Sequence, residues 1–165
     1  AFRQEYARLC RAIANGAEVP AGPAPEDVTD ETVDFTAKVW FDDKPLGTSF
    51  GSVIIQPSAS CNRGDLVSAQ FWGAHPNNNL RTQDSFLVVE RLVGGNYVPV
   101  AYDWDPDTTY RWERNSIAYS KITITWNTLN AAPGTYRIRH KGNWKSGWTG
   151  RISPYEGVTR AFRVQ

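Results

Sequence analysis

The sequence predicts an all-β fold, an immunoglobulin-like antiparallel β-sandwich preceded by one N-terminal helix and a proline-rich linker. Short runs that alternate apolar and polar residues recur along the chain, and turn residues separate them at sandwich spacing. In the stretch 122–141, ITITWNTLNAAPGTYRIRHK, the residues Ile122, Ile124 and Trp126 share one strand face. Tyr136 follows the next turn, where a tyrosine corner returns its hydroxyl to the preceding loop backbone.

The composition is that of a folded domain with an extension. The chain has 165 residues, of which 41% are hydrophobic and 13% aromatic, enough for one ordinary core. Its 18 basic and 17 acidic residues give a net charge of +1, so we expect no nucleic-acid partner. No membrane span or signal peptide is recognisable. The chain has no methionine and begins inside a helical pattern, so we expect a piece of a longer protein.

The first 34 residues predict a helix and a linker. Apolar residues in the segment 1–16 recur at helical spacing, at Phe2, Tyr6, Leu9 and Ile13. We expect this helix to be the last helix of a preceding domain. The segment 17–34 is rich in proline, alanine and acidic residues, as in a stiff solvated linker. Residues 35–165 then form the immunoglobulin-like domain.

The strands of this domain follow from period-2 alternation, and a Gly-Gly-Asn turn joins two of them as a hairpin. We predict strands at Phe35–Phe41, Val53–Gln56, Leu66–Gly73, Ser85–Val93, Tyr97–Asp103, Arg111–Arg114, Lys121–Trp126, Thr135–Lys141 and Thr159–Val164. Short strands without an intervening helix favour two antiparallel sheets. Periodicity alone does not separate this fold from a jelly roll.

An acidic run at the end of one strand is the strongest candidate for a binding site. Asp103, Asp105 and Asp107 fall within six residues, together with Thr108. Carboxylate and hydroxyl oxygens suit a hard cation such as Ca²⁺ or Mg²⁺, although the run is not an EF-hand loop. An acidic β-turn with local hydrogen bonds is the alternative, and the spacing alone favours it.

Most of the seven tryptophans suit a core role. Trp40, Trp72 and Trp126 lie in strand patterns and are expected to pack. Trp144 and Trp148 fall in a predicted glycine-rich loop, GNWKSGWTGR, beside basic residues. Such aromatic residues suit a membrane surface or a sugar ring. A loop tucked against a neighbouring domain is the alternative.

The histidines and cysteines give no catalytic site. His75 and His140 lack further metal ligands at a known spacing, and no serine or cysteine occupies a nucleophile motif. Loop hydrogen bonding explains both histidines better. Cys10 and Cys61 have no CxxC spacing, and two free thiols are a simpler expectation than a bridge.

The order of several segments resembles the C-terminal portion of the neutral ceramidases. These segments are FRQEYARL, PLGTSFGSVI, FWGAHPNNNLRTQDSFLVVER, YDWDPDTTYRWER, WNTLNAAPGTYRIRHKGNWK and EGVTRAFRV. The resemblance covers essentially the whole chain. It implies a secreted or membrane-anchored zinc amidase that cleaves the N-acyl bond of ceramide to sphingosine and a fatty acid. The zinc and its ligands belong, by this resemblance, to the larger N-terminal domain, outside this chain.

The resemblance also implies particular sites and partners. The family pattern Asp-x-Asp-x-x-Thr, which binds Mg²⁺ or Ca²⁺, falls on Asp103, Asp105 and Thr108, so the resemblance favours the metal over the plain turn. The expected partner is the ceramidase catalytic domain, with a membrane surface reached through Trp144 and Trp148. We expect an accessory domain without an active site of its own. The alternative is a free-standing module that binds carbohydrate or a lipid surface.

Overall fold

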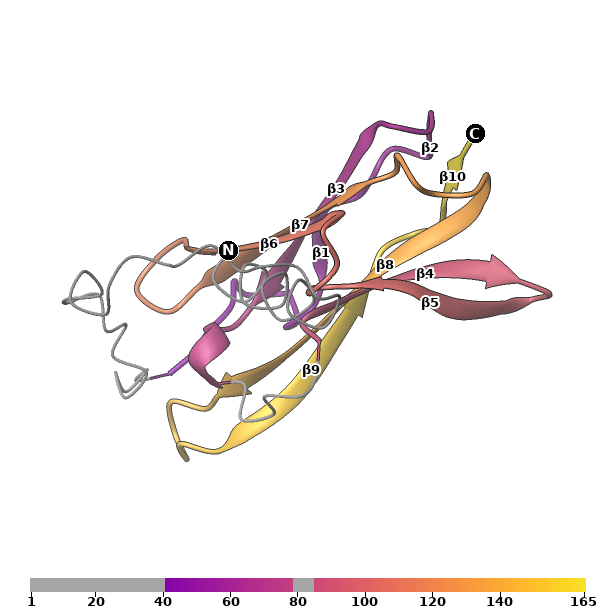
Figure 1. Cartoon of the computed structure of the whole chain (residues 1–165). Coiled ribbons are helices and arrows are strands. Elements are labelled where there is room, and N and C mark those ends of the chain that lie inside the picture. The colour runs from indigo at the N-terminus through magenta and orange to yellow at the C-terminus, as the bar shows by residue number, and fades with distance from the viewer. Residues whose placement is uncertain (1–40, 79–84) are drawn as a thin grey trace, which may run out of the picture.

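The computed structural model describes residues 41–78 and 85–165, which fold into two packed β-sheets (Figure 1). The predicted helix 1–16, the linker 17–34, Trp40 and nearly all of the predicted strand Phe35–Phe41 lie outside the described residues. Within the described ranges, no helix has the length and apolar character needed to cross a membrane.

The strand order is that of an immunoglobulin-like domain. One sheet has the order β1-β3-β7-β6, comprising β1 (Val53–Ile55), β3 (Leu66–Gly73), β7 (Ser120–Asn127) and β6 (Thr108–Arg114). The other has the order β2-β10-β8-β4-β5, comprising β2 (Ser60–Cys61), β10 (Phe162–Val164), β8 (Gly134–Lys145), β4 (Leu87–Val93) and β5 (Asn96–Tyr102). A further strand, β9 (Ile152–Val158), also pairs with β8. These two orders correspond to the two sheets of an immunoglobulin sandwich, with β8 in the place of strand F.

The core lies between the sheets because alternate residues of each strand point inward. In β7 the burial alternates over the whole strand, and Ile122, Ile124 and Trp126 are its inward residues. The ring of Trp126 lies 4.9 Å from that of Tyr136 on the opposite sheet. Burying one such side chain stabilises the fold by about 1.5–3 kcal/mol. The face predicted from periodicity is therefore confirmed.

The predicted tyrosine corner is also confirmed. Tyr136 is 2% exposed, and its hydroxyl donates a hydrogen bond to the carbonyl oxygen of Ala132 in the preceding loop. Burial raises the pKa of this phenol, and the nearby Arg91 opposes that rise. The corner therefore fixes the loop that leads into β8.

Several predicted strands match, and four features differ. β3 has the predicted bounds, whereas β6 and β8 are longer than predicted. β2 and β9 were not predicted, since β2 has two residues and β9 contains Pro154 and Gly157. β2 pairs with β10 in parallel, so the second sheet is not wholly antiparallel. The predicted glycine-rich loop is wrong for Gly142–Lys145, which continue β8 and pair with β9.

The hairpin of β8 and β9 reaches across to the other sheet. A Cβ built on Gly157 would lie 1.6 Å from the carbonyl oxygen of Gly51, and one on Gly51 would lie 2.4 Å from that of Glu156. Gly51 also has a positive φ of 88°, which glycine adopts at little cost. These two glycines let β9 lie against the loop before β1.

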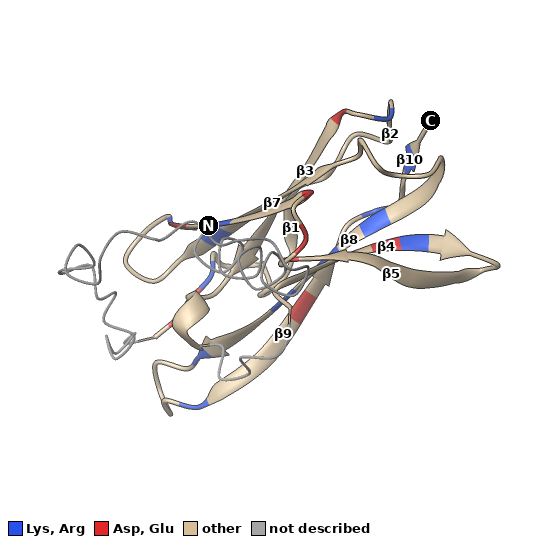
Figure 2. Cartoon of the chain, in the orientation of Figure 1, with Lys and Arg blue, Asp and Glu red and all other residues tan. Residues whose placement is uncertain are grey.

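Charged residues on β4, β8 and β9 form a small network, and Figure 2 shows acidic and basic positions close together on β4 and β8. Glu90 accepts from Arg137 and from Arg139, and Arg139 also pairs with Glu156 at 3.1 Å. Burial raises the pKa of Glu90, but hydrogen bonds and charge from Arg139 and Arg137 outweigh burial and lower it. These residues lie close together because β4 and β9 both pair with β8. We assign the network a structural role.

Candidate functional site

The acidic turn between β5 and β6 is held by its own hydrogen bonds. The Asp105 carboxylate accepts from the backbone N–H of Tyr102 at 2.7 Å, and the Asp105 carbonyl accepts from the N–H of Thr108 at 3.1 Å. The Thr108 hydroxyl lies 2.6 Å from the carbonyl oxygen of Tyr102 and 3.0 Å from that of Asp105. These contacts close the turn with local hydrogen bonds, but they do not form an Asx turn, because the Asp105 carboxylate accepts from a residue before it rather than from one after it.

Asp103, at the beginning of that turn, contacts the start of β4. Its carboxylate accepts from the N–H of Phe86 at 3.0 Å, and its own N–H donates to the Ser85 hydroxyl at 3.2 Å. Asp103 is 6% exposed and Thr108 is 1% exposed. The turn thus joins β5 and β6 to the beginning of β4.

The residues predicted to bind a cation lie in one turn, and their chemistry fits a hard cation because every donor is an oxygen. Two carboxylates and one hydroxyl come from Asp103, Asp105 and Thr108, and the described residues contain no group of three or more His, Cys, Asp or Glu placed to hold a metal. Asp107 points elsewhere, since its carboxylate lies 3.4 Å from the Asn130 side-chain amide. The Mg²⁺ or Ca²⁺ site therefore stays a prediction, with Asp107 apart from it.

A second buried aspartate, Asp42, was not predicted. It is 4% exposed, and its carboxylate accepts from the N–H groups of His75 and Lys145, both at 2.9 Å, and from the Asn78 side-chain amide. Asn78 ends the short 3₁₀ helix η2 (Pro76–Asn78). Asp42 thus ties the entering chain to η2 and to the end of β8. Local sequence gave no signal for it, because its partners lie 33 to 103 residues away.

His140 is a core residue of β8 rather than a residue with the loop hydrogen bonding that the sequence predicted. It is fully buried between the carbonyl oxygen of Phe86, 2.8 Å from Nδ1, and the Tyr155 hydroxyl, 2.9 Å from Nε2. Burial lowers its pKa to about 4, against a weaker opposing effect of the Phe86 carbonyl. The ring is therefore neutral at pH 7, and it donates through Nδ1 to Phe86 and accepts through Nε2 from Tyr155.

Tyr155, which donates to His140, also accepts a hydrogen bond from the residue that follows β3. Its hydroxyl accepts from the N–H of Ala74 at 2.9 Å, and burial raises its pKa well above the usual range. A Cβ on Gly142 would lie 2.4 Å from the same hydroxyl, so glycine is needed there. His140 and Tyr155 connect the two sheets through Ala74.

His75 also has a structural explanation. Its Nδ1 accepts from the N–H of Asn77 at 3.1 Å, and its ring packs edge-on against Trp112, with centroids 4.5 Å apart. Burial lowers its pKa, and the positive charge of Arg114 lowers it further. Loop hydrogen bonding is therefore confirmed for His75, whereas it is wrong for His140, which lies buried within β8.

The two tryptophans expected at a surface differ from one another. Trp144 lies in β8, half-buried, and stacks on Phe50 with ring centroids 5.0 Å apart. Trp148 lies in the turn between β8 and β9 and is 99% exposed. The sequence predicted a surface position for both tryptophans. Trp148 is exposed as predicted, whereas Trp144 packs within the domain.

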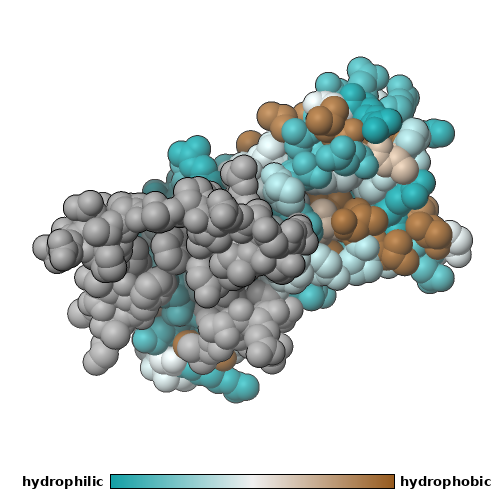
Figure 3. All heavy atoms as spheres, in the orientation of Figure 1, coloured by the Kyte–Doolittle hydropathy of each residue, from teal (hydrophilic) through white to brown (hydrophobic). Residues whose placement is uncertain are grey.

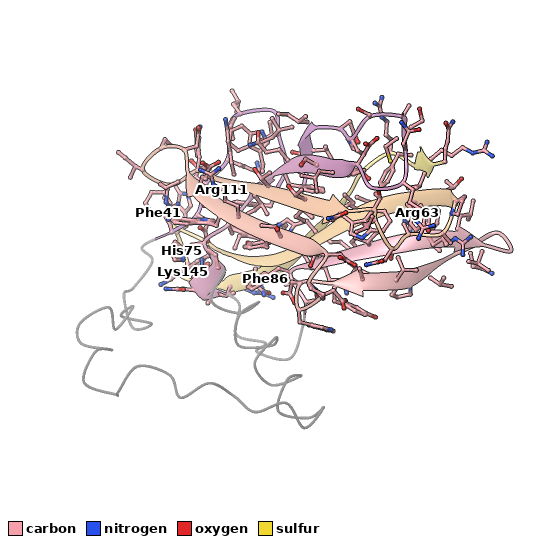
Figure 4. All side chains as sticks on the ribbon, turned by 45° about the horizontal axis from the view of Figure 1, so that its top comes forward. Phe41, Arg63, His75, Phe86, Arg111 and Lys145 are labelled. Carbon is pink, nitrogen blue, oxygen red and sulfur yellow. The ribbon has the colours of Figure 1, made fainter. Side chains whose placement is uncertain are left out.

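Trp148 borders an open cleft of about 780 Å³ between the loop 41–50 and the β8–β9 hairpin. Aromatic and polar side chains share its walls, and the aromatic ones besides Trp148 are Phe41, Phe50, Trp144 and Tyr155. Figure 4 shows Phe41, His75 and Lys145 at this end of the sandwich and Arg63 at the opposite end. Cys61, on the strand β2, is a free thiol, and Cys10 lies outside the described residues.

Comparisons with known proteins agree with one another. The family described as neutral/alkaline non-lysosomal ceramidase, C-terminal, matches residues 6–164. The chain is 36% identical over 167 residues to neutral ceramidase B of Dictyostelium discoideum, covering 99% of this chain and 23% of that protein. It is 40% identical over 168 residues to the neutral ceramidase of Pseudomonas aeruginosa, covering 99% of this chain and 25% of that protein.

A solved structure supports the same relationship. The crystal structure of the Pseudomonas aeruginosa neutral ceramidase matches with a TM-score of 0.75 and 41% identity, covering 93% of this chain and 25% of that chain. The chain therefore spans about a quarter of the length of the relatives that it matches.

Proposed function

Because the chain belongs to the C-terminal family of the neutral/alkaline non-lysosomal ceramidases, we propose that it is the accessory domain of an enzyme that hydrolyses the N-acyl amide of ceramide to sphingosine and a fatty acid. The observation that carries the proposal is the match of residues 6–164 to that family. In this proposal, catalysis and its zinc belong to a separate catalytic domain of the longer protein, which packs on this one.

Hydrolysis of a fluorescent ceramide analogue tests the division of labour. The longer polypeptide that contains this chain should release fatty acid, whereas residues 1–165 alone, supplied with zinc, should stay at background. Zinc-dependent turnover by the 165-residue chain that disappears in His75→Ala would contradict the proposal. So would an inactive longer polypeptide that is folded and loaded with zinc.

The proposal includes a structural Mg²⁺ or Ca²⁺ held by Asp103, Asp105 and Thr108. A bound cation would neutralise the two carboxylates at the end of β5. Support comes from the all-oxygen donor set in one turn that also binds the start of β4. The cation would stabilise the junction of β4, β5 and β6 rather than take part in hydrolysis.

Secretion of the whole enzyme is a further part of the proposal, by resemblance to the family. Detection of the longer protein in the medium of its native cells would support it. Retention of the folded enzyme inside those cells would count against it.

A second candidate function is recognition of a surface by this domain. The observation that favours it is Trp148, which is 99% exposed beside the aromatic cleft of about 780 Å³. An exposed indole next to such walls suits a lipid surface or a sugar ring.

A further inference from the structure

Three large apolar side chains are almost completely exposed, and each lies at the tip of a different turn. Leu46 is 103% exposed, Ile117 is 93% exposed and Trp148 is 99% exposed. Burial of these side chains would stabilise the protein, yet the fold holds them in water. We name Leu46, Ile117 and Trp148 the tip residues.

The three turns lie together at one end of the sandwich. The N–H of Asp43 donates to the carbonyl of Ala118 at 3.0 Å, which joins the turn of Leu46 to that of Ile117. The N–H of Asp42 donates to the carbonyl of Lys145 at 2.9 Å, which joins the same segment to the β8–β9 hairpin. Backbone contacts therefore connect all three turns.

Hydrogen bonds close each turn, so the tips are displayed by ordered backbone. Thr48 donates its N–H to the carbonyl of Pro45 at 3.1 Å, and Gly47 has a φ of 81°, which places Leu46 at the second position of a type II turn. The N–H of Asn115 bonds the carbonyl of Tyr119 at 2.9 Å around Ile117.

The turn of Trp148 is closed in the same way. The N–H of Gly150 donates to the carbonyl oxygen of Ser146 at 2.9 Å. The N–H of Ser146 donates to the carbonyl oxygen of Arg151, also at 2.9 Å. Binding through pre-ordered turns loses little chain entropy.

Basic residues surround the tip residues. The segments 43–49, 114–119 and 145–151 carry four basic residues and one acidic residue; the basic residues are Lys44, Arg114, Lys145 and Arg151, and the acid is Asp43. Such a local excess attracts an anionic surface, although the whole chain has a net charge of only +1.

We propose that the tip residues insert into the interface of an anionic lipid bilayer, with the four basic side chains contacting lipid headgroups. Separate protruding tips fit a soft, deformable interface better than a flat protein surface, where apolar contacts form a continuous patch. Tryptophan at the water boundary and basic residues around aliphatic tips are features of interfacial binding. The inference deepens the proposed function, on which it rests for its biological setting, because ceramide is a membrane lipid.

Sedimentation of the 165-residue chain with lipid vesicles tests this inference. The chain should bind vesicles of phosphatidylcholine with about 30% phosphatidylserine more tightly than vesicles of phosphatidylcholine alone. The triple variant Leu46→Ser, Ile117→Ser, Trp148→Ser should bind the anionic vesicles about a hundredfold more weakly. The double variant Lys44→Gln, Arg151→Gln should lose about tenfold on anionic vesicles and little on neutral ones.

A matched control uses exposed apolar residues at the other end, where Figure 3 shows apolar residues on the surface near the β4–β5 hairpin. The variant Leu66→Ser, Val93→Ser, Leu129→Ser removes side chains that are 67%, 49% and 57% exposed, and it should bind like the wild type. Urea unfolding of both triple variants checks that each remains folded.

Several results would overturn the inference. These are no vesicle binding by the wild type, equal loss in the control, or tip variants that bind normally. Tip variants that keep vesicle binding but lose a soluble glycan or the catalytic domain would assign this surface to that other partner.

Activity measurements separate the inference from the proposed function. In the longer polypeptide, the tip variant should keep turnover of detergent-solubilised ceramide and lose turnover of ceramide in anionic vesicles. Absence of all ceramide hydrolysis with intact vesicle binding would refute the proposed function and leave the inference standing.

Discussion

Asp42 should be among the most sensitive positions of the domain. Replacing it with alanine removes the acceptor for three donors, namely the N–H groups of His75 and Lys145 and the Asn78 amide. A buried donor left without a partner costs about 1–3 kcal/mol. Asp42 also lines the open cleft, so water can reach part of the site. We therefore expect Asp42→Ala to lower the free energy of unfolding by about 3 kcal/mol.

The adjacent Asp43 provides a matched control. It is exposed, and its carboxylate accepts from the N–H of the next residue, Lys44, at 2.8 Å. Asp43→Ala should therefore change stability by no more than about 0.5 kcal/mol. The stability of Asp42→Asn should lie between those of the two alanine variants. The amide keeps one acceptor oxygen, but its NH₂ group replaces the other oxygen and faces donors that then lack an acceptor.

Urea unfolding followed by tryptophan fluorescence measures all three variants. A loss of about 3 kcal/mol corresponds to a fall in melting temperature of roughly 6–12 °C for a chain of this size. If Asp42→Ala and Asp43→Ala unfold at the same urea concentration, Asp42 does not hold η2 and β8 together as we infer.

Three further predictions concern the cation, the buried histidine and a glycine contact. A chelator should lower the melting temperature of the wild type, because a ligand bound only to the folded state at a hundredfold excess over Kd adds about 2.7 kcal/mol to the free energy of unfolding. The double variant Asp103→Asn, Asp105→Asn should abolish this response. If the wild type does not respond and calorimetry detects no Ca²⁺ or Mg²⁺ binding, the segment is a plain acidic turn. Burial lowers the pKa of His140 from the usual 6.5 of a histidine to about 4 in the folded state, so only the unfolded state binds this proton between those values. The unfolding free energy should therefore fall as the pH drops from about 6.5 to 4, by up to roughly 3 kcal/mol. A pH dependence that is unchanged in His140→Gln would count against this assignment. Gly157→Ala should destabilise the domain by several kcal/mol, about as much as a severe core substitution. The reason is that the new Cβ would lie 1.6 Å from the Gly51 carbonyl oxygen. An unchanged melting temperature would mean that β9 does not pack against the loop before β1.

The alternating strands were predictable because each carries its own signal. Ile122, Ile124 and Trp126 show the buried face directly, and the position of Tyr136 after a turn predicted a corner that the structure contains. β9 was not predicted because it contains Pro154 and Gly157, which have a weak preference for strands. It forms nevertheless because it pairs with β8. The same pairing makes Gly142–Lys145 strand rather than loop.

The sites were less predictable because they depend on contacts between distant segments. The acidic turn is local, and its residues were found from spacing and family pattern. Asp42 accepts a hydrogen bond from Lys145, 103 residues away, so no nearby pattern marks it. No sequence pattern marked Leu46 or Ile117, and only the fold brings their turns beside that of Trp148.

The two long outer strands bear on how the domain behaves at high concentration. Among residues 41–78 and 85–165, β5 and β6 each have one side without a strand partner in their sheet order. Such sides can recruit strands of other molecules. Pro99 removes a donor from the middle of β5, and an irregular register beside it bends the strand. On β6, the charged residues Arg111, Glu113 and Arg114 oppose stacking of copies. These features of β5 and β6 oppose edge-to-edge pairing between copies of the domain.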